Sequence, residues 1–266
     1  MDEISWFLLV ALLSWGAWLA GVRIAGRSRR AARCTLVTAG SLLVMWVWLM
    51  KRPAVAAEIL PIGVLSQIEG VGSLPWFMLL LGAAWARSVR PRQKVVIGWA
   101  MLLGLMVFVN GGRWMLQSTP SAVMGAERGA LTVLQSQDYT CVPASCATML
   151  NRLGHRTTEA EMAELTRTRP GVGSTSMRAV DGVNRLLAQA GVPERAVLLE
   201  LELDEVTDGL LPVMTPVNLE PGRRHMVVIT GHRRGFIEVV DPMEGTTLYE
   251  RDEFRAIYGG HVVAIP

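Results

Sequence analysis

The sequence predicts an all-α region of four transmembrane helices, residues 1–114, followed by an α+β domain, residues 115–266. Three observations predict this division. All nine tryptophans lie at or before Trp114, whereas all three tyrosines and all four histidines follow it. The net charge changes at the same place, from +8 before it to −5 after it. Long uncharged runs fill the first part, and short helical and strand-like segments separated by turns fill the second.

Four uncharged runs in the first part are long enough to cross a bilayer. A helix needs roughly 17–25 apolar residues to cross the hydrocarbon core, and each run holds 17 to 19. Helices of soluble bundles usually keep a polar face, which these runs lack. The third run is the weakest candidate because Gly70, Gly72 and Pro75 interrupt its start. The predicted spans are Ile4–Val22, Cys34–Met50, Gly70–Ala86 and Val95–Gly112.

The segment Ala54–Gln67 lies between the second and third runs. It is apolar, but it contains Glu58 and Pro61. A charge and a helix breaker both disfavour a membrane span. We therefore predict an interfacial or re-entrant piece here.

Arginine and lysine gather in two of the predicted loops. The loop after the first run and the loop after the third hold nine basic residues, against three on the opposite side. Loops rich in Lys and Arg stay in the cytoplasm. Arg outnumbers Lys by 24 to 2, which is typical of a GC-rich bacterial genome. We therefore predict a multi-pass protein of a bacterial inner membrane, with both termini and the α+β domain on the outer, periplasmic face.

Periodicity in the second part places helices before strands. Helical spacing covers Cys141–Leu153, and a third helix ends at Leu187. Between them, Thr158 and Glu161 predict a capping box at the start of the helix Glu159–Thr166. Helices followed by an antiparallel sheet are typical of a layered α+β domain. The expected later elements are strands at Ala196–Leu201, Val213–Asn218, His225–Thr230, Phe236–Val240 and Thr246–Tyr249, a helix at Arg251–Tyr258 and a strand at His261–Ile265.

The stretch QSQDYTCVPASC places Cys141 between a polar turn and a helix. Pro143, near the first helical position, supports a helix that begins at or just after Cys141. The positive end of a helix dipole stabilises a thiolate, the reactive form of cysteine. The alternative is that Cys141 is a small apolar residue used in packing. A nucleophile would also need a base, a group that orients the base, and donors for an oxyanion.

His225 is the preferred base. It begins the strand HMVVI, and Asp241 ends the strand FIEVVD 16 residues later. A hairpin through Gly231–Gly235 brings these two strand ends together, where a carboxylate can orient an imidazole. His261 is the rival because it also begins an apolar strand, but no acidic residue follows it. The remaining histidines are expected in solvated positions: His155 in a loop and His232 in the hairpin tip.

These segments resemble a known family. QSQDYTCVPASCATMLNRLG, with HMVVITG and VVDPMEG downstream, resembles the bacteriocin-processing, double-glycine family of papain-like cysteine peptidases. The resemblance covers residues 130–266 and implies a papain-like fold. It implies that Cys141 is the nucleophile, that His225 is the general base and acid, and that Asp241 orients the histidine.

The resemblance also implies an oxyanion hole. Gln135, six places before the cysteine, would form it with the Cys141 backbone amide, and Gln137 is the weaker alternative. This sequence departs from the family at Val142, where members often have glycine, so we expect a differently shaped cleft. No GxxxxGK[ST] phosphate loop occurs, so this chain alone is not an ABC exporter. The periplasmic location is a further departure, because exporter-linked members cut in the cytoplasm.

Other sites are not indicated. Neither HExxH nor CxxC occurs, so we predict no metal and no cofactor. No basic stripe interleaved with aromatic residues occurs, so we predict no nucleic-acid partner. Five residues along a helix separate Cα atoms by about 8–9 Å, beyond the reach of about 7 Å for a disulfide. We therefore predict that Cys146 is buried core rather than a disulfide partner of Cys141, and that Cys34 is a small apolar residue at a membrane edge.

The sequence thus predicts a membrane-anchored cysteine endopeptidase that cleaves a peptide or protein substrate. The resemblance implies Gly-Gly leader peptides as that substrate and a peptide exporter as a partner besides the lipid bilayer. Two alternatives stay open. One is a non-catalytic module that binds leader peptides, and the other is a papain-like amidase that acts on a different amide.

Overall fold

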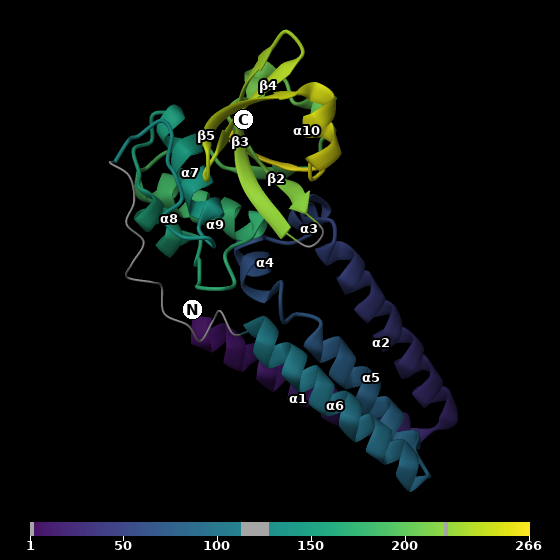
Figure 1. Ribbon diagram of the computed structural model, residues 1–266. Coiled ribbons are helices and arrows are strands. Elements are labelled where there is room, and N and C mark those ends of the chain that lie inside the picture. Colours follow the sequence, from purple (N-terminus) through teal and green to yellow (C-terminus); the bar gives the residue numbers. More distant parts are fainter. Residues whose placement is uncertain (1–2, 113–127, 221–222) are drawn as a thin grey trace. The chain divides into compact units, whose positions relative to one another are not determined.

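The chain folds into two compact units, which we describe separately (Figure 1). The computed structural model describes residues 3–112, 128–220 and 223–266. The first unit comprises Met1–Arg52 and Val64–Gln117, and the second comprises Pro53–Gly63 and Ser118–Pro266. The segment Pro53–Gly63, which lies between the second and third apolar runs in the sequence, therefore belongs to the second unit.

The first unit is all-α. Three of its described helices are long and apolar enough to cross a membrane: α1 (Glu3–Arg27), α2 (Arg29–Met50) and α6 (Pro91–Gly112). The third predicted run forms a shorter apolar helix, α5 (Leu74–Arg87), which has 14 residues and follows the short helix α4 (Ile62–Ile68). At 1.5 Å per residue, α5 is about 21 Å long, less than the roughly 30 Å of a hydrocarbon core.

Glycines allow α1 and α5 to pack with their backbones in close proximity. A Cβ atom added at Gly82 would lie 2.4 Å from the Trp18 carbonyl oxygen, and one at Gly21 would lie 2.4 Å from the Leu79 carbonyl oxygen. Small residues at such crossings are typical of helices that pack within a membrane, where close van der Waals contact drives association. The rings of Phe7 and Phe108 stack with centroids 4.5 Å apart and join α1 to α6.

The second unit is α+β, as predicted. Its helices α7 (Cys141–Arg152), α8 (Glu159–Leu165) and α9 (Ser176–Gln189) precede a six-stranded antiparallel sheet of order β1-β6-β2-β3-β4-β5. The capping box predicted from Thr158 and Glu161 is present at the start of α8. The remaining elements are β1 (Val197–Leu199), β2 (Val213–Glu220), β3 (Arg223–Arg233), β4 (Phe236–Asp241), β5 (Gly245–Glu250), α10 (Arg251–Ile257) and β6 (Val262–Ala264).

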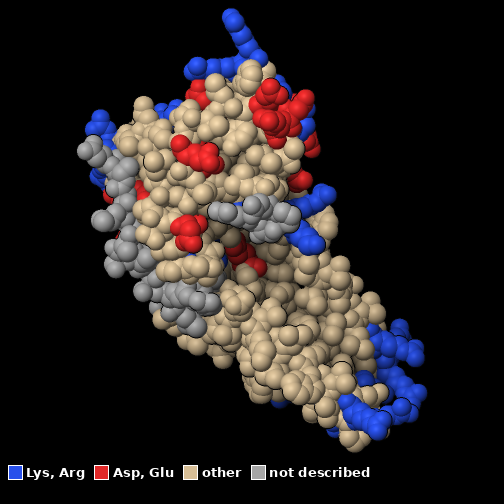
Figure 2. Space-filling model, viewed as in Figure 1, with Lys and Arg blue, Asp and Glu red and all other residues tan. Residues whose placement is uncertain are grey.

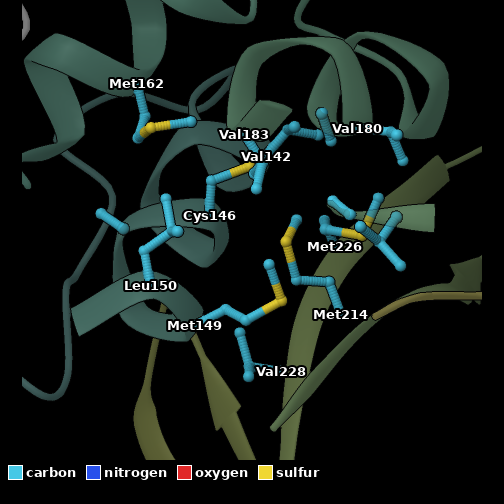
Figure 3. Packing of buried hydrophobic residues seen from close by; sticks show 14 of the residues in the cluster. Val142, Cys146, Met149, Leu150, Met162, Val180, Val183, Met214, Met226 and Val228 are labelled. Atoms are coloured by element: carbon cyan, nitrogen blue, oxygen red, sulfur yellow. The ribbon is translucent and has the colours of Figure 1, made fainter. Parts of the chain in front are cut away.

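Two apolar clusters cover the two faces of the sheet. Alternate residues of a strand point to opposite faces. Met226 and Val228 of β3 accordingly pack with α7 in one cluster, part of which Figure 3 shows. Val227 and Ile229 of the same strand pack in the other cluster, which includes the fully buried Phe254 of α10. The sheet is therefore enclosed between α7–α9 and α10.

The segment Ala54–Gln67, for which we predicted an interfacial or re-entrant piece, forms α3 (Pro53–Ile59) and α4. Helix α3 contacts α9 and β1 within the second unit. Its Ala54 is buried in the cluster that joins α7 to the sheet. The apolar residues of α3 thus contribute to the core of the α+β unit.

The hairpin between β3 and β4 differs from the prediction. Its turn consists of Arg234 and Gly235 alone, with φ angles of 42° and 91°. Strand β3 therefore continues to Arg233, and His232 pairs with Ile237 inside the sheet. The prediction that His232 lies in the hairpin tip is wrong, because a two-residue turn with positive φ closes a hairpin more tightly than a five-residue connection.

We expect Gly82→Ala to destabilise the helical unit, because the added methyl group would overlap the Trp18 carbonyl. Overpacking of this kind costs about 1–3 kcal/mol. The matched control is Gly98→Ala on α6, where an added Cβ meets nothing within 4 Å. Thermal unfolding of the detergent-solubilised chain should show a lower midpoint for Gly82→Ala and no loss for Gly98→Ala. Equal midpoints would contradict the close crossing of α1 and α5.

Candidate active site

Cys141 is the first residue of α7. The turn before it is closed by Thr140, whose hydroxyl accepts a hydrogen bond from the Gln137 amide at 3.1 Å and donates one to the Gln137 carbonyl at 2.9 Å. Residues 142–151 of the helix are all buried, whereas Cys141 itself is partly exposed. The helix is thus a core element whose N-terminal thiol reaches the surface.

Two hydrogen bonds tie α7 to its surroundings. The Ser145 hydroxyl donates to the Met226 carbonyl of β3 at 3.0 Å, and the Val133 amide donates to the Thr148 hydroxyl at 3.0 Å. Met226 adjoins His225 in the sequence, so the first of these bonds fixes α7 against β3 beside the predicted base. Both bonds are buried, where an unpaired polar group costs about 1–3 kcal/mol.

The structure brings Cys141, His225 and Asp241 together. The His225 Nε2 atom lies 2.8 Å from Asp241 Oδ1, and both side chains are buried. The Cys141 side chain is near enough to the imidazole to contribute to the raised pKa of His225. Because Nε2 is occupied by Asp241, Nδ1 is the ring nitrogen left to face the thiol. The Met243 amide donates to the same Asp241 oxygen at 2.7 Å and so holds the carboxylate in place.

These contacts set the protonation of the pair. Burial lowers the pKa of His225, but hydrogen bonds to Asp241 and Cys141, together with their negative charges, outweigh it and raise the pKa to about 9. Burial raises the pKa of Asp241, but the hydrogen bonds from His225 and the Met243 amide outweigh it and lower the pKa below its usual value. The arrangement therefore favours an imidazolium beside an ionised carboxylate at neutral pH.

Gln135 lies next to the segment that follows Asp241. Its backbone amide donates to the Pro242 carbonyl at 2.8 Å. Its side-chain oxygen is buried and has no hydrogen-bond partner in the part of the chain that the structure describes. A buried polar atom without a partner is uncommon in a folded protein. Gln137, the weaker alternative, instead supplies the backbone groups of the turn closed by Thr140.

Glu159 also supports this segment, and the sequence analysis did not select it. One carboxyl oxygen of this fully buried residue accepts a hydrogen bond from the Ser136 amide at 2.9 Å. Ser136 directly follows Gln135, so Glu159 fixes the backbone on which Gln135 is mounted. In the sequence, Glu159 looks like an ordinary acidic residue in the first turn of α8, and only its burial against a distant segment reveals its contact.

The other histidines lie outside the triad. The His261 Nε2 atom lies 2.9 Å from the Ser176 hydroxyl, and burial lowers the pKa of His261. His232 pairs with Asp208 at 2.9 Å on the far part of the hairpin. Cys146 is fully buried, as predicted. Burial raises the pKa of its thiol, and the charge of the nearby Cys141 raises it further. Among the described residues, no group of three His, Cys, Asp or Glu side chains is arranged to hold a metal ion.

We expect Asp241→Asn to lower the pKa of His225 from about 9, because it removes the charge that stabilises the imidazolium. A group whose pKa rises on folding stabilises the fold below its unfolded pKa, about 6.5 for His, and loses that contribution as the pH rises through about 9. Titration of the His225 ring by NMR measures the shift directly. Asp208→Asn, which removes the partner of His232, is the matched control and should leave the His225 titration unchanged.

We expect Glu159→Ala to reduce peptide turnover without changing the reactivity of Cys141. The substitution leaves the partly buried Ser136 amide without its acceptor, which frees the segment that carries Gln135, whereas the contacts of Cys141 and His225 stay intact. Turnover and the rate of alkylation by a small thiol reagent should therefore separate. Glu164→Ala, an exposed position on the same helix, is the control and should change neither. Parallel loss of turnover and alkylation would contradict this role.

Comparison with known proteins agrees with the fold and the motif. A family model described as the Peptidase C39 family matches residues 130–266. An uncharacterized protein of Methanothermobacter thermautotrophicus is 30% identical over 134 residues, which is 50% of this chain and 86% of that protein. An uncharacterized protein of Methanothermobacter marburgensis is 31% identical over 133 residues, again 50% of this chain and 86% of that protein.

Solved structures with a similar fold are peptidase domains. The peptidase domain of Streptococcus ComA, a bifunctional ABC transporter involved in a quorum-sensing pathway, is 18% identical with a TM-score of 0.43, covering 50% of this chain and 96% of that domain. A double glycine motif protease from an AMS/PCAT transporter, solved with a leader peptide, is 18% identical with a TM-score of 0.42, covering 56% of this chain and 100% of that protease. The match to the family model covers half of the sequence, and the matched range includes Cys141, His225 and Asp241. The chain therefore belongs to the Peptidase C39 family.

Proposed function

We propose that this chain is a membrane-anchored cysteine endopeptidase in which Cys141 is the nucleophile and His225 the general base and acid. Asp241 orients the imidazole, and Gln135 contributes to the oxyanion hole. The observation that carries the proposal is the buried, hydrogen-bonded pair of His225 and Asp241 next to Cys141, which is the first residue of a buried helix. Nucleophile, base and orienting acid within hydrogen-bonding reach are the arrangement that covalent acyl transfer requires.

The contacts of these residues define the chemical steps. The proton of the Cys141 thiol resides on His225 before the reaction, and the resulting thiolate attacks the carbonyl carbon of the scissile peptide bond. The tetrahedral intermediate collapses when His225 returns the proton to the amine of the leaving peptide, which leaves a thioester on Cys141. His225 then removes a proton from water, which attacks the thioester, and the thiol is regenerated as the acid product departs. The raised pKa of His225 favours the imidazolium that the second step consumes.

The oxyanion needs donors close to Cys141. The first backbone amides of a helix have no intrahelical acceptor and point toward its N-terminus, so the Cys141 amide is one such donor. The Gln135 side chain is the second that we assign. Its backbone is fixed through Pro242 and, by way of Ser136, through Glu159. A donor that is positioned before the reaction stabilises developing charge without reorganisation.

The apolar helices provide the anchor. We propose that α1, α2 and α6 span a membrane and that α5 extends far enough with α4 to complete a four-helix region within residues 1–114. The peptidase domain would then comprise residues 115–266, with Pro53–Gly63 packed onto it. The basic residues around the connections between α1 and α2 and between α5 and α6 support our proposal that this end lies in the cytoplasm and the peptidase domain on the outer face.

The substrate that we propose is a peptide cleaved after Gly-Gly. This follows from membership of the Peptidase C39 family and from the resemblance of the Cys141 segment to double-glycine peptidases. A leader peptide carried by a partner exporter would present such a bond near the membrane. Val142, which stands where related enzymes often have glycine, is buried in the core cluster beside the nucleophile.

The test is the pH dependence of Cys141 alkylation, read at Cys141 by peptide mass mapping so that the buried Cys146 stays in place. We expect alkylation to persist well below the ordinary thiol pKa of about 8.5 in the wild type and to lose that persistence in His225→Ala. Cleavage of a peptide containing Gly-Gly should disappear in Cys141→Ala. His261→Ala, which alters the partly buried histidine directly before β6, is the control and should retain the alkylation profile of the wild type.

Two outcomes would count against the proposal. If Cys141 reacts as an ordinary free thiol in both proteins, the site is not an activated nucleophile and a leader-binding role takes its place. If Cys141 is activated but Gly-Gly peptides stay intact, the chemistry stands and the substrate contains a different amide.

A further inference from the structure

The first unit carries a concentration of unpaired positive charge at one end. Nine basic side chains lie there, all of them exposed. Within the described residues, none of the nine forms an ion pair with an acidic side chain. Figure 2 shows basic side chains of this unit gathered as blue atoms at that end. They are Arg23, Arg27, Arg29, Arg30, Arg33, Arg87, Arg90, Arg92 and Lys94.

Helix packing holds the two basic turns beside each other. Ala25 near the end of α1, Ala32 near the start of α2 and Ala83 near the end of α5 form one buried cluster. Leu36 and Ala86 pack against it. The turn between α1 and α2 and the turn between α5 and α6 therefore share one end of the unit, and the concentrated charge follows from the fold.

A groove of about 520 Å³ opens at this end between α2, α5 and α6. Its lining changes in character along the helices. Arg87 is the last residue of α5 and Arg92 is the second residue of α6, so the charged groups lie close to the connection between these helices. Leu36, Val96 and Ile97 lie one to two helical turns further into the unit and give the groove an apolar wall. Val96 is 66% exposed, so this wall is open to a ligand.

We propose that this groove binds one acidic phospholipid. Two guanidinium groups offer planar pairs of N–H donors that match the geometry of a phosphate group. The apolar wall directly beside them suits the first part of an acyl chain, which a free phosphate does not have. Basic pockets between transmembrane helices on the cytoplasmic side have this chemistry. The inference rests on the membrane anchoring proposed above and is independent of the peptidase activity.

The experiment measures binding of phosphatidylglycerol to the full-length chain, delipidated in neutral detergent, by native mass spectrometry. We expect one molecule to be retained in preference to phosphatidylcholine. Arg87→Ala/Arg92→Ala should weaken this binding about thirtyfold, since each basic residue near an anionic lipid surface contributes about fivefold. The control, Arg29→Ala/Arg30→Ala, makes the same change in charge at the neighbouring turn but outside the groove lining, and it should lose clearly less binding than the groove variant.

A third variant tests the apolar wall. Val96→Trp keeps every charge but fills the groove, and it should also lose phosphatidylglycerol. Equal losses in the two double-arginine variants would overturn the inference, because general surface charge would then explain the binding. Retention of phosphatidylglycerol by Val96→Trp, or its displacement by inorganic phosphate alone, would overturn it in favour of a phosphate site. Binding of a second copy of the chain at this groove, in place of the lipid, would also overturn the inference.

The outcomes for the two proposals are distinguishable. Cys141→Ala should bind phosphatidylglycerol like the wild type, because the thiol lies in the other unit. A chain that is recovered from membranes only with detergent but shows no preference for phosphatidylglycerol overturns the lipid site alone. A chain that is recovered without detergent overturns both the membrane anchor and the lipid site, whereas loss of peptidase activity affects neither.

Discussion

The burial of α7 is the constraint on which the candidate active site depends. A helix whose residues 142–151 are all inside the domain can take only one position relative to the sheet. Any rotation would expose its apolar side or leave its buried polar groups without hydrogen-bond partners. The bond from Ser145 to the Met226 carbonyl fixes that position beside His225. The first helical residue then lies beside His225, and the thiol of Cys141 is presented to the imidazole that we propose as its base.

Electrostatic interactions of buried acidic residues also hold the candidate site in place. Asp241 receives hydrogen bonds from His225 and from the Met243 amide, so its charge persists although it is buried. That charge holds a proton on His225 against the effect of burial. A second buried acidic residue, Glu159, supports the site in a similar way. Its carboxyl group accepts a hydrogen bond from the Ser136 amide and so holds the segment that carries Gln135. The site therefore depends on buried acidic groups that reach it from two different elements.

The helical unit uses a different set of forces. Its surface is apolar, and in the membrane location proposed for it the hydrophobic effect would supply little driving force between helices that face lipid. Close backbone packing at Gly21 and Gly82 and the Phe7–Phe108 stack provide specific contacts instead. Most of its charged residues lie at or near helix ends, and the fold gathers two of the connections between helices at one end.

The sequence by itself determined the α+β class of the second unit, its helices and strands, the capping box at Thr158, and the candidates Cys141, His225 and Asp241. Local periodicity, turn chemistry and motif spacing are enough for these features, because each depends on neighbours along the chain. Only the tertiary structure placed α3 in the core of the second unit, shortened α5 and put His232 inside a strand. It also revealed Glu159 and the groove between Arg87 and Arg92. These features depend on contacts between segments distant in sequence, and residue type and spacing do not encode which distant surfaces meet.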